Sequence, residues 1–239
     1  MNEPLMRTMS GQLATRIRQK ILGGDYAPGT ALLQDSIAAE FGVSKIPVRE
    51  ALVRLRAEGL IDIEAHRGFR VRPLSADEVD EVFRLRLTLE PAAVAIGAKL
   101  AKDADHAAAR DALRALDSAL AMGARTPDAA PAADVRGDIG SFNSAFHLAL
   151  IVPHAQPVSM EVLSRLHTLS QRYVRMHLLP AGRVRRASRE HDTLFTTWMK
   201  GDARAARRLT QAHIEETRDE LAATLVNTRR SSPSGNPGR

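Results

Sequence analysis

The segment from residue 33 to residue 71 constrains the fold of this chain more than any other, because it holds two short helical patterns in quick succession. The first pattern ends at Gly42, a residue type that commonly ends helices. The second begins at Ser44, a suitable N-cap, and continues to Ala57 with apolar residues at helical spacing. We therefore predict a helix-turn-helix, whose second helix can enter the major groove of DNA with its N-terminus first.

Two short runs of alternating apolar residues follow this motif. Ile61 and Ile63 form the first run, and Phe69 and Val71 form the second, around a turn at residues 66–68. Alternation on both sides of a glycine-containing turn predicts a β-hairpin. The hairpin would form a basic wing beside the second helix.

The residues that we expect to contact DNA lie at the start and on one flank of the second helix, and at the tip of the wing. They are Ser44, Lys45, Ile46, Pro47, Arg49, Arg54, Arg67 and Gly68. Arginine and lysine bind phosphates and guanine edges in the major groove. The wing tip would approach the minor groove or the backbone, so double-stranded operator DNA is the expected partner.

This segment resembles the winged helix-turn-helix of the GntR family of bacterial transcription regulators. The resemblance rests on IRQKILGGDYAPGTALL, VSKIPVREAL, LRAEGLI and HRGFRV, which agree with the family in order and spacing. The family usually has Arg-Thr where this chain has Lys45 and Ile46. Lysine is a point charge without the bidentate fork of arginine, and isoleucine lacks a hydroxyl. The operator sequence therefore cannot be transferred from relatives.

The composition favours helices for the remainder of the chain. Hydrophobic residues make up 44% of its 239 residues and aromatic residues only 4%, while alanine, leucine and arginine are frequent. After the first domain every pattern is helical. We predict a mainly α protein, with a winged helix-turn-helix at 1–73, an all-helical bundle at 74–226 and a disordered tail at 227–239.

The bundle should contain a long first helix, a loop rich in proline and alanine, and a helical hairpin at its end. The expected helices are 76–100, 105–122, 139–152, 157–179, 183–200 and 202–226, with the loop at 123–138. Gly201 would lie at the turn of the final hairpin.

Charge and targeting features are consistent with a nucleic-acid partner. The formal net charge is +6, and a basic balance suits DNA as well as general solvation. The chain has no cysteine, which excludes disulfides and thiolate metal sites. No apolar run approaches the roughly 18 residues of a membrane span, and the N-terminus lacks a secretory signal. We expect a cytoplasmic protein without a membrane partner.

Three of the eight histidines have a spacing that suits a metal site. Asn143 and His147 are four residues apart, so they share one helix face. His191 lies ten residues before Gly201 and His213 twelve after it, about 15 and 18 Å along antiparallel helices. Three imidazoles and an oxygen donor would hold a divalent ion, zinc or nickel. The alternative is three independent buried histidines.

Four other histidines have no such spacing, and we expect them to be surface or capping residues. They are His106, His154, His167 and His177.

The second half resembles the all-helical effector-binding domain, called FCD, of the FadR-like branch of the same family. The matching segments are FRLRLTLEPAAVAIGA, NSAFHLAL and EHDTLFTTWMKGDARAARRLTQAH. Many members bind a metal through one aspartate and three histidines, and the resemblance places His147, His191 and His213 at those three histidines. Asn143 stands at the aspartate position. Its side-chain oxygen can ligate a metal, but it is neutral and therefore weaker.

The resemblance also implies that Arg86 faces the effector pocket, where a guanidinium would suit a small carboxylate. The alternative is an ion pair between Arg86 and Glu90, one helical turn apart. The basic run at 183–189 could contact DNA, although a solvated helix start fits it better.

Two functions therefore remain. The first is a homodimeric DNA-binding regulator, expected to be a repressor, gated by a small organic acid. The second is a metal-dependent hydrolase, because three-histidine sites also activate water. Glu190, next to His191, is a poor general base because it projects about 100° away around the helix. The helix-turn-helix favours the regulator.

Overall fold

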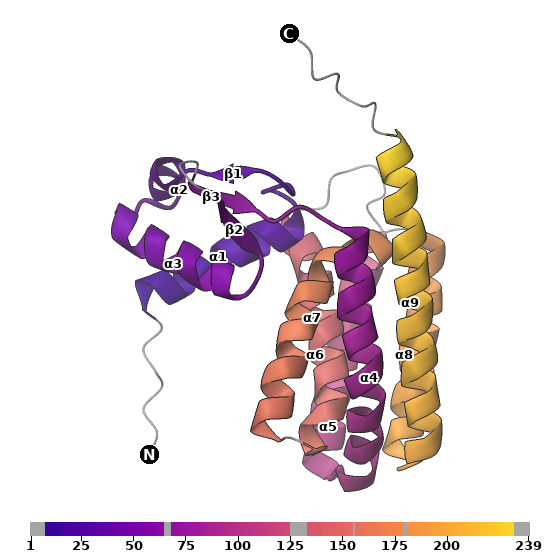
Figure 1. Ribbon diagram of the computed structural model, residues 1–239. Helices are drawn as coiled ribbons and strands as arrows, with labels where there is room; N and C mark the ends of the chain where they lie inside the picture. Colours follow the sequence, from indigo (N-terminus) through magenta and orange to yellow (C-terminus); the bar gives the residue numbers. More distant parts are fainter. Residues whose placement is uncertain (1–7, 65–67, 125–132, 155, 179–180, 232–239) are drawn as a thin grey trace, which may run out of the picture.

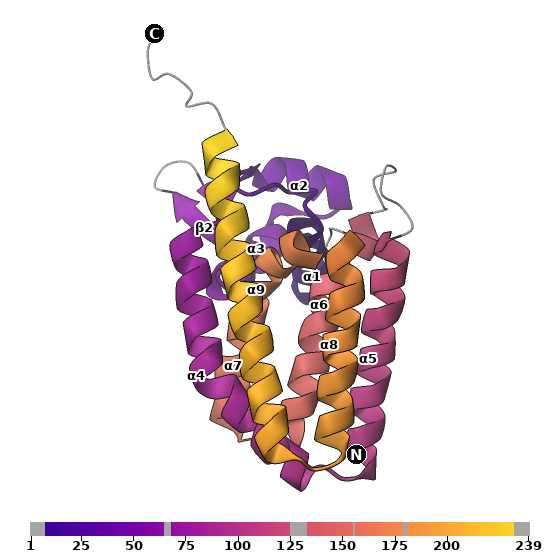
Figure 2. The same ribbon diagram turned by 90° about the vertical axis from the view of Figure 1, so that its right-hand side faces the viewer.

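The structure is a computed structural model that describes residues 8–64, 68–124, 133–154, 156–178 and 181–231. A small N-terminal part with helices and a sheet lies at one end of a longer bundle of helices that run side by side (Figures 1 and 2). The mainly helical fold class predicted from the sequence is confirmed.

The N-terminal part has a three-stranded sheet beside three helices. Its elements are α1 (Met9–Gly23), β1 (Ala31–Leu32), α2 (Gln34–Phe41), α3 (Lys45–Ala57), β2 (Ile61–Glu64) and β3 (Gly68–Val71). The strands pair antiparallel in the order β1-β3-β2, with Phe69 opposite both Leu32 and Ile63. The prediction did not include β1, because two residues are too few to show alternation.

Helix α3 divides clearly between a buried and an exposed face. Gly42 adopts φ of 64°, a left-handed conformation that ends α2 and turns the chain into α3. Ser44 occupies the N-cap position as predicted, but its side chain makes no capping hydrogen bond. The buried face of α3 consists of Val48, Ala51, Leu52 and Leu55, which pack in one core with α1 and the sheet.

The C-terminal part is a bundle with its own core. Its elements are α4 (Ala76–Leu100), α5 (Asp103–Ala124), α6 (Ala133–Ile151), the 3-10 helix η1 (Val152–His154), α7 (Pro157–Leu178), α8 (Ala181–Met199) and α9 (Ala203–Ser231). Gly201, with φ of 71°, lies at the turn between α8 and α9. Within the described ranges, no helix is both long and apolar enough to span a membrane.

Helix α1 begins at Met9, where the Thr8 side chain accepts a hydrogen bond from the amide of Gly11. Two later helix boundaries differ from the prediction. Helix α6 begins at Ala133, six residues inside the expected loop, and residues 125–132 of that loop lie outside the described residues. Helix α9 continues to Ser231 and so includes the start of the expected tail.

Glycine at position 97 lets α4 and α6 approach closely. A Cβ atom on Gly97 would lie only 2.1 Å from the carbonyl oxygen of Leu150. The indole Nε1 of Trp198 donates a hydrogen bond to that same oxygen at 3.1 Å. Three helices of the bundle therefore meet at this point in close contact.

Helix α7 connects the two parts directly. Arg165 Nη1 donates to the carbonyl of Ala57, the last residue of α3, at 2.6 Å. Leu169 lies against Gly59. Arg172, whose side chain is almost fully buried, donates to the carbonyls of Arg72 and Pro73 in the segment between the two parts. The end of the second helix of the helix-turn-helix is thus bonded to the bundle.

Candidate nucleic-acid interface and metal centre

The residues of the second helix expected to contact DNA lie at the N-cap and on the outer side of α3. Ser44, Lys45, Arg49 and Arg54 are exposed, and Pro47 is half-buried. Ile46 is 72% exposed.

Lys45 forms an ion pair with Asp35 of α2. Both side chains are mostly exposed, so the pair contributes little to stability and can open when a phosphate approaches.

The wing is described only in part. Gly68 is exposed with φ of 80°, whereas Arg67 lies outside the described residues. Arg70 pairs with Glu64 of the neighbouring strand at 2.8 Å and donates to the carbonyl of Gly29. Its guanidinium is therefore held against the sheet.

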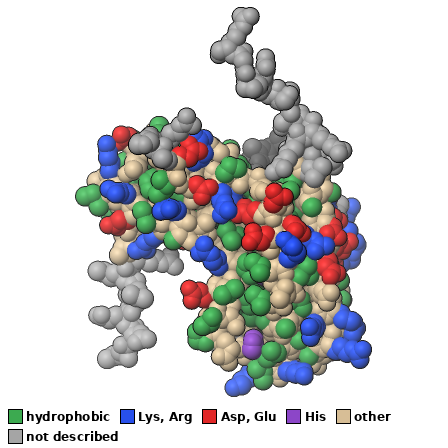
Figure 3. Space-filling model, in the orientation of Figure 1, with side chains coloured by type: hydrophobic (Ala, Val, Ile, Leu, Met, Phe, Trp, Pro, Cys, Tyr) green, Lys and Arg blue, Asp and Glu red, His purple; other side chains and the backbone are tan. Residues whose placement is uncertain are grey.

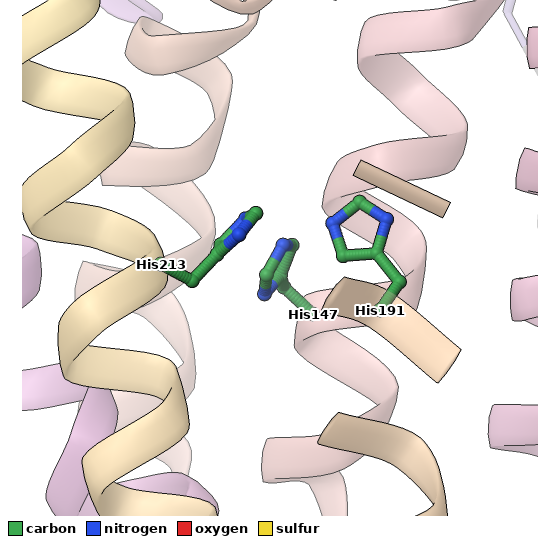
Figure 4. A group of neighbouring side chains, drawn as sticks. All are labelled: His147, His191 and His213. Carbon is green, nitrogen blue, oxygen red and sulfur yellow. The ribbon is translucent and has the colours of Figure 1, made fainter. Parts of the chain in front are cut away.

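The structure brings His147, His191 and His213 together from α6, α8 and α9 (Figure 4). One nitrogen from each ring can be chosen so that all three lie within 4.8 Å of one another. The ring centroids of His191 and His213 are 4.9 Å apart, so the two helices of the hairpin do place them at one level. His147 and His191 are fully buried, while the His213 side chain is 13% exposed.

A buried carboxylate lies next to this cluster. Glu90 Oε1 is 3.4 Å from His147 Nδ1, and Glu90 Oε2 is 3.3 Å from His167 Nε2. The Arg86 guanidinium binds both carboxylate oxygens, at 2.8 and 3.2 Å, and contacts the Ser170 hydroxyl. The ion pair that the sequence offered as an alternative is therefore formed.

Burial and charge set the protonation of this group. Burial raises the pKa of the Glu90 carboxyl, but Arg86 and the two adjacent imidazoles outweigh it and bring the pKa well below its ordinary value. Burial lowers the pKa of His147 to about 3 and also lowers that of His167. Both imidazoles are therefore neutral at pH 7, the form in which histidine ligates metals.

The residues present fit a divalent metal ion. The donor set consists of three imidazoles from three helices, and Nε2 of His147 is buried without a hydrogen bond in the described part of the chain. Asn143 is buried one turn before His147 on α6. Such a nitrogen-rich set suits zinc or nickel.

Sequence reasoning missed two neighbours of the cluster. His167, which we expected at the surface or at a cap, is buried on α7, and its ring stacks on that of His147 at 5.8 Å. Glu190, which we expected to point away, has Oε2 2.9 Å from Nδ1 of His213. The side chain of His177 lies outside the described residues, and His106 packs edge-on against Trp198.

A groove of about 340 Å³ between α8 and α9 leads to His213. Arg186, Arg189, Glu190 and Glu216 line it together with His213 and apolar residues. Arg186 belongs to the basic run at 183–189, and it forms ion pairs with Glu190, Glu216 and Glu220. This arginine therefore joins α8 to α9.

Comparisons with known proteins identify both parts of the chain. Residues 9–71 match the family model of bacterial regulatory proteins of the gntR family, and residues 81–216 match that of the FCD domain.

Curated relatives include the Nta operon transcriptional regulator of Aminobacter aminovorans, 36% identical over 94 residues. That match covers 39% of this chain and 45% of the relative. Another is the regulator McbR of Escherichia coli, 30% identical over 108 residues, which cover 45% of this chain and 49% of McbR. The sequence matches span less than half the length of these curated relatives.

Solved structures show the same fold at low identity. The structure of McbR/YncC from E. coli has a TM-score of 0.73 and 22% identity, covering 94% of this chain and all of that one. A putative GntR regulator from Rhodococcus sp. RHA1 has a TM-score of 0.70 and 20% identity, covering 90% and 97%. Family and relatives are regulators of transcription rather than enzymes, which removes the hydrolase alternative. The chain belongs to the gntR family of bacterial regulatory proteins and carries an FCD domain.

Proposed function

We propose that this protein is a transcriptional repressor whose operator affinity is controlled by a small organic acid bound in a metal-containing bundle. The observation that carries the proposal is the contact of one helix, α7, with both sites. His167 and Ser170 of α7 face the buried Arg86–Glu90 pair, and Arg165 contacts the end of α3. A rearrangement at the histidines can therefore reach the DNA-binding surface through a single rigid element.

On the DNA side, α3 would enter the major groove with Ser44, Lys45, Ile46 and Pro47 at its tip. Arg49 and Arg54 would supply base and phosphate contacts, and Arg67 and Gly68 would approach the backbone or minor groove from the wing. The exposure of the described members of this set supports the assignment.

On the effector side, His147, His191 and His213 would hold the metal, with Asn143 as a neutral oxygen donor. The bound ion would supply a fixed positive charge for the carboxylate of the acid. Arg86 is the second candidate anchor for that carboxylate. Because its guanidinium already binds Glu90 at both oxygens, it has to release part of this pair to bind the acid.

The exposed apolar surface of α4 and α7 is the candidate dimer interface. Figure 3 shows hydrophobic side chains on this face, and a hollow of about 290 Å³ lies between the two helices. Its exposed members include Leu85, Leu89, Ile96, Val158 and Val162. A contiguous apolar surface that stays uncovered is costly in water, and a second copy would bury it.

The function is tested by a quantitative gel shift at fixed salt with DNA from upstream of the gene itself. The protein should bind this DNA, and Arg49→Ala should weaken binding by about 1–3 kcal/mol if Arg49 reads a base. A thermal-shift screen of small organic acids should find one that binds the protein. That acid should then lower the affinity for DNA in the gel shift. No binding to any upstream segment would contradict the proposal.

The dimer is tested separately by light scattering of the full chain. Val158, 73% exposed, should tolerate substitution by arginine without loss of fold, yet Val158→Arg should convert a dimer into a monomer. A wild-type protein that is monomeric at micromolar concentration would contradict the two-half-site arrangement.

A further inference from the structure

Glu190 is an acidic residue within hydrogen-bond distance of His213. Its Oε2 lies 2.9 Å from His213 Nδ1, and its Oε1 accepts a hydrogen bond from Arg186 Nε at 2.8 Å. The contact joins α8 to α9 beside the three-histidine cluster.

Which of its two ring nitrogens carries the proton decides whether His213 can bind a metal through Nε2. An ionised carboxylate only accepts hydrogen bonds, so the proton of His213 must be on Nδ1 for this contact to form. Nε2 then keeps its lone pair free. In neutral imidazole the hydrogen bond of one nitrogen sets the role of the other.

We propose that Glu190 is a positioning residue that fixes His213 with its proton on Nδ1 and presents Nε2 to the metal. The inference rests on the metal site proposed above. A second acid–histidine contact lies in the same cluster, where Glu90 Oε1 is 3.4 Å from Nδ1 of His147. Two of the three imidazoles thus have a carboxylate near Nδ1, and a carboxylate bonded to that nitrogen orients metal-binding histidines.

The charge of the donor set gives Glu190 a further role. Asn143 is uncharged, so the three imidazoles and Asn143 bring no negative charge to a divalent ion. A carboxylate hydrogen-bonded to a ligand raises the basicity of that ligand. Glu190 therefore supplies, through His213, part of the charge that Asn143 does not supply directly.

Arg186 holds the Glu190 carboxylate in place. It bonds to Glu190 from one turn earlier on α8, and it also forms ion pairs with Glu216 and Glu220 of α9. This arrangement suggests a competing explanation, in which Glu190 simply joins the two helices. Only the positioning role predicts an effect on the tautomer of His213.

The test compares Glu190→Ala, Glu190→Gln and the control Glu216→Gln. The control perturbs the same arginine, but no hydrogen bond or ion pair joins Glu216 to a histidine among the described residues. In a competition titration with Zn²⁺ or Ni²⁺, Glu190→Ala should bind about 10–100-fold more weakly, as for other residues that orient metal ligands. Glu190→Gln should be intermediate because its amide oxygen still accepts the bond, and Glu216→Gln should match the wild type.

A second measurement needs no metal. ¹⁵N NMR of histidine-labelled, metal-free protein should show His213 protonated on Nδ1 in the wild type, assigned by loss of the resonance in His213→Ala. In Glu190→Ala the proton should move toward Nε2, the nitrogen that carries it in free histidine. The wild-type proton on Nε2, or wild-type affinity in Glu190→Ala, overturns the positioning role. Failure of the wild type to bind either metal refutes the metal site instead, and the NMR result still decides the tautomer.

Discussion

Replacement of Arg172 by leucine should destabilise the protein more than any arginine change on the surface. The Arg172 side chain is 3% exposed, and it donates to the carbonyls of Arg72 and Pro73 while it contacts the Glu78 carboxylate. Removing one partner of a buried ion pair costs about 3–5 kcal/mol. Because Glu78 keeps its contacts with Tyr173 and Arg72, we expect a loss near the lower limit, about 3 kcal/mol.

Trp198 is the single tryptophan of the chain and is fully buried in the bundle, so its fluorescence reports the unfolding of that part. The matched control is Arg114→Leu, because Arg114 is 74% exposed and pairs weakly with Asp111. The control should stay within about 0.5 kcal/mol of the wild type. If Arg172 transmits the effector response, Arg172→Leu should also bind DNA with little dependence on the acid. Unfolding in urea, followed by the fluorescence of Trp198, measures the stability of both variants. Equal unfolding midpoints would refute this reasoning.

Three further changes test the fold and the two sites. Gly97→Ala should cost about 1–3 kcal/mol or more in thermal unfolding, because its methyl group meets the Leu150 carbonyl; an unchanged melting temperature would disprove the close approach. Ile46→Thr should alter the DNA sequences chosen in a binding-site selection while stability changes by less than about 0.5 kcal/mol, since the side chain is 72% exposed; a large fall in melting temperature would mean that Ile46 is packed. Asn143→Asp should tighten Zn²⁺ binding in a competition titration, and identical affinity would remove Asn143 from the ligand set.

The DNA-binding part could be predicted from the sequence because its elements follow from local rules. Short apolar periods, Gly42 and the turn near Gly68 define α2, α3 and the hairpin without knowledge of the bundle. The placement of His191 and His213 at the same height along α8 and α9 could be predicted too, because the helix rise and the turn at Gly201 determine it. Strand β1 could not, since its pairing with β3 depends on residues nearly forty positions away.

His167 and Glu190 show what helix periodicity leaves open. Helix α7 contacts the bundle core on one side and the DNA-binding part on another, so its apolar pattern does not identify one inward direction. His167 could therefore not be placed from spacing. Glu190 does project away from His191 around α8, as expected, but α9 lies on that side and carries His213. The relative placement of neighbouring helices decided both cases.

The buried Arg86–Glu90 pair is explained better by the proposed ligand response than by a role in stability. Both side chains are at most 3% exposed, and desolvation of two charges can exceed their attraction, so apolar residues would often stabilise a core at least as well. The carboxylate also contacts His147 of the candidate metal site and His167 of α7. Any anion that draws the guanidinium of Arg86 away leaves Glu90 to these two imidazoles. Because α7 holds the end of α3 through Arg165, such an exchange would be transmitted toward the DNA-binding surface.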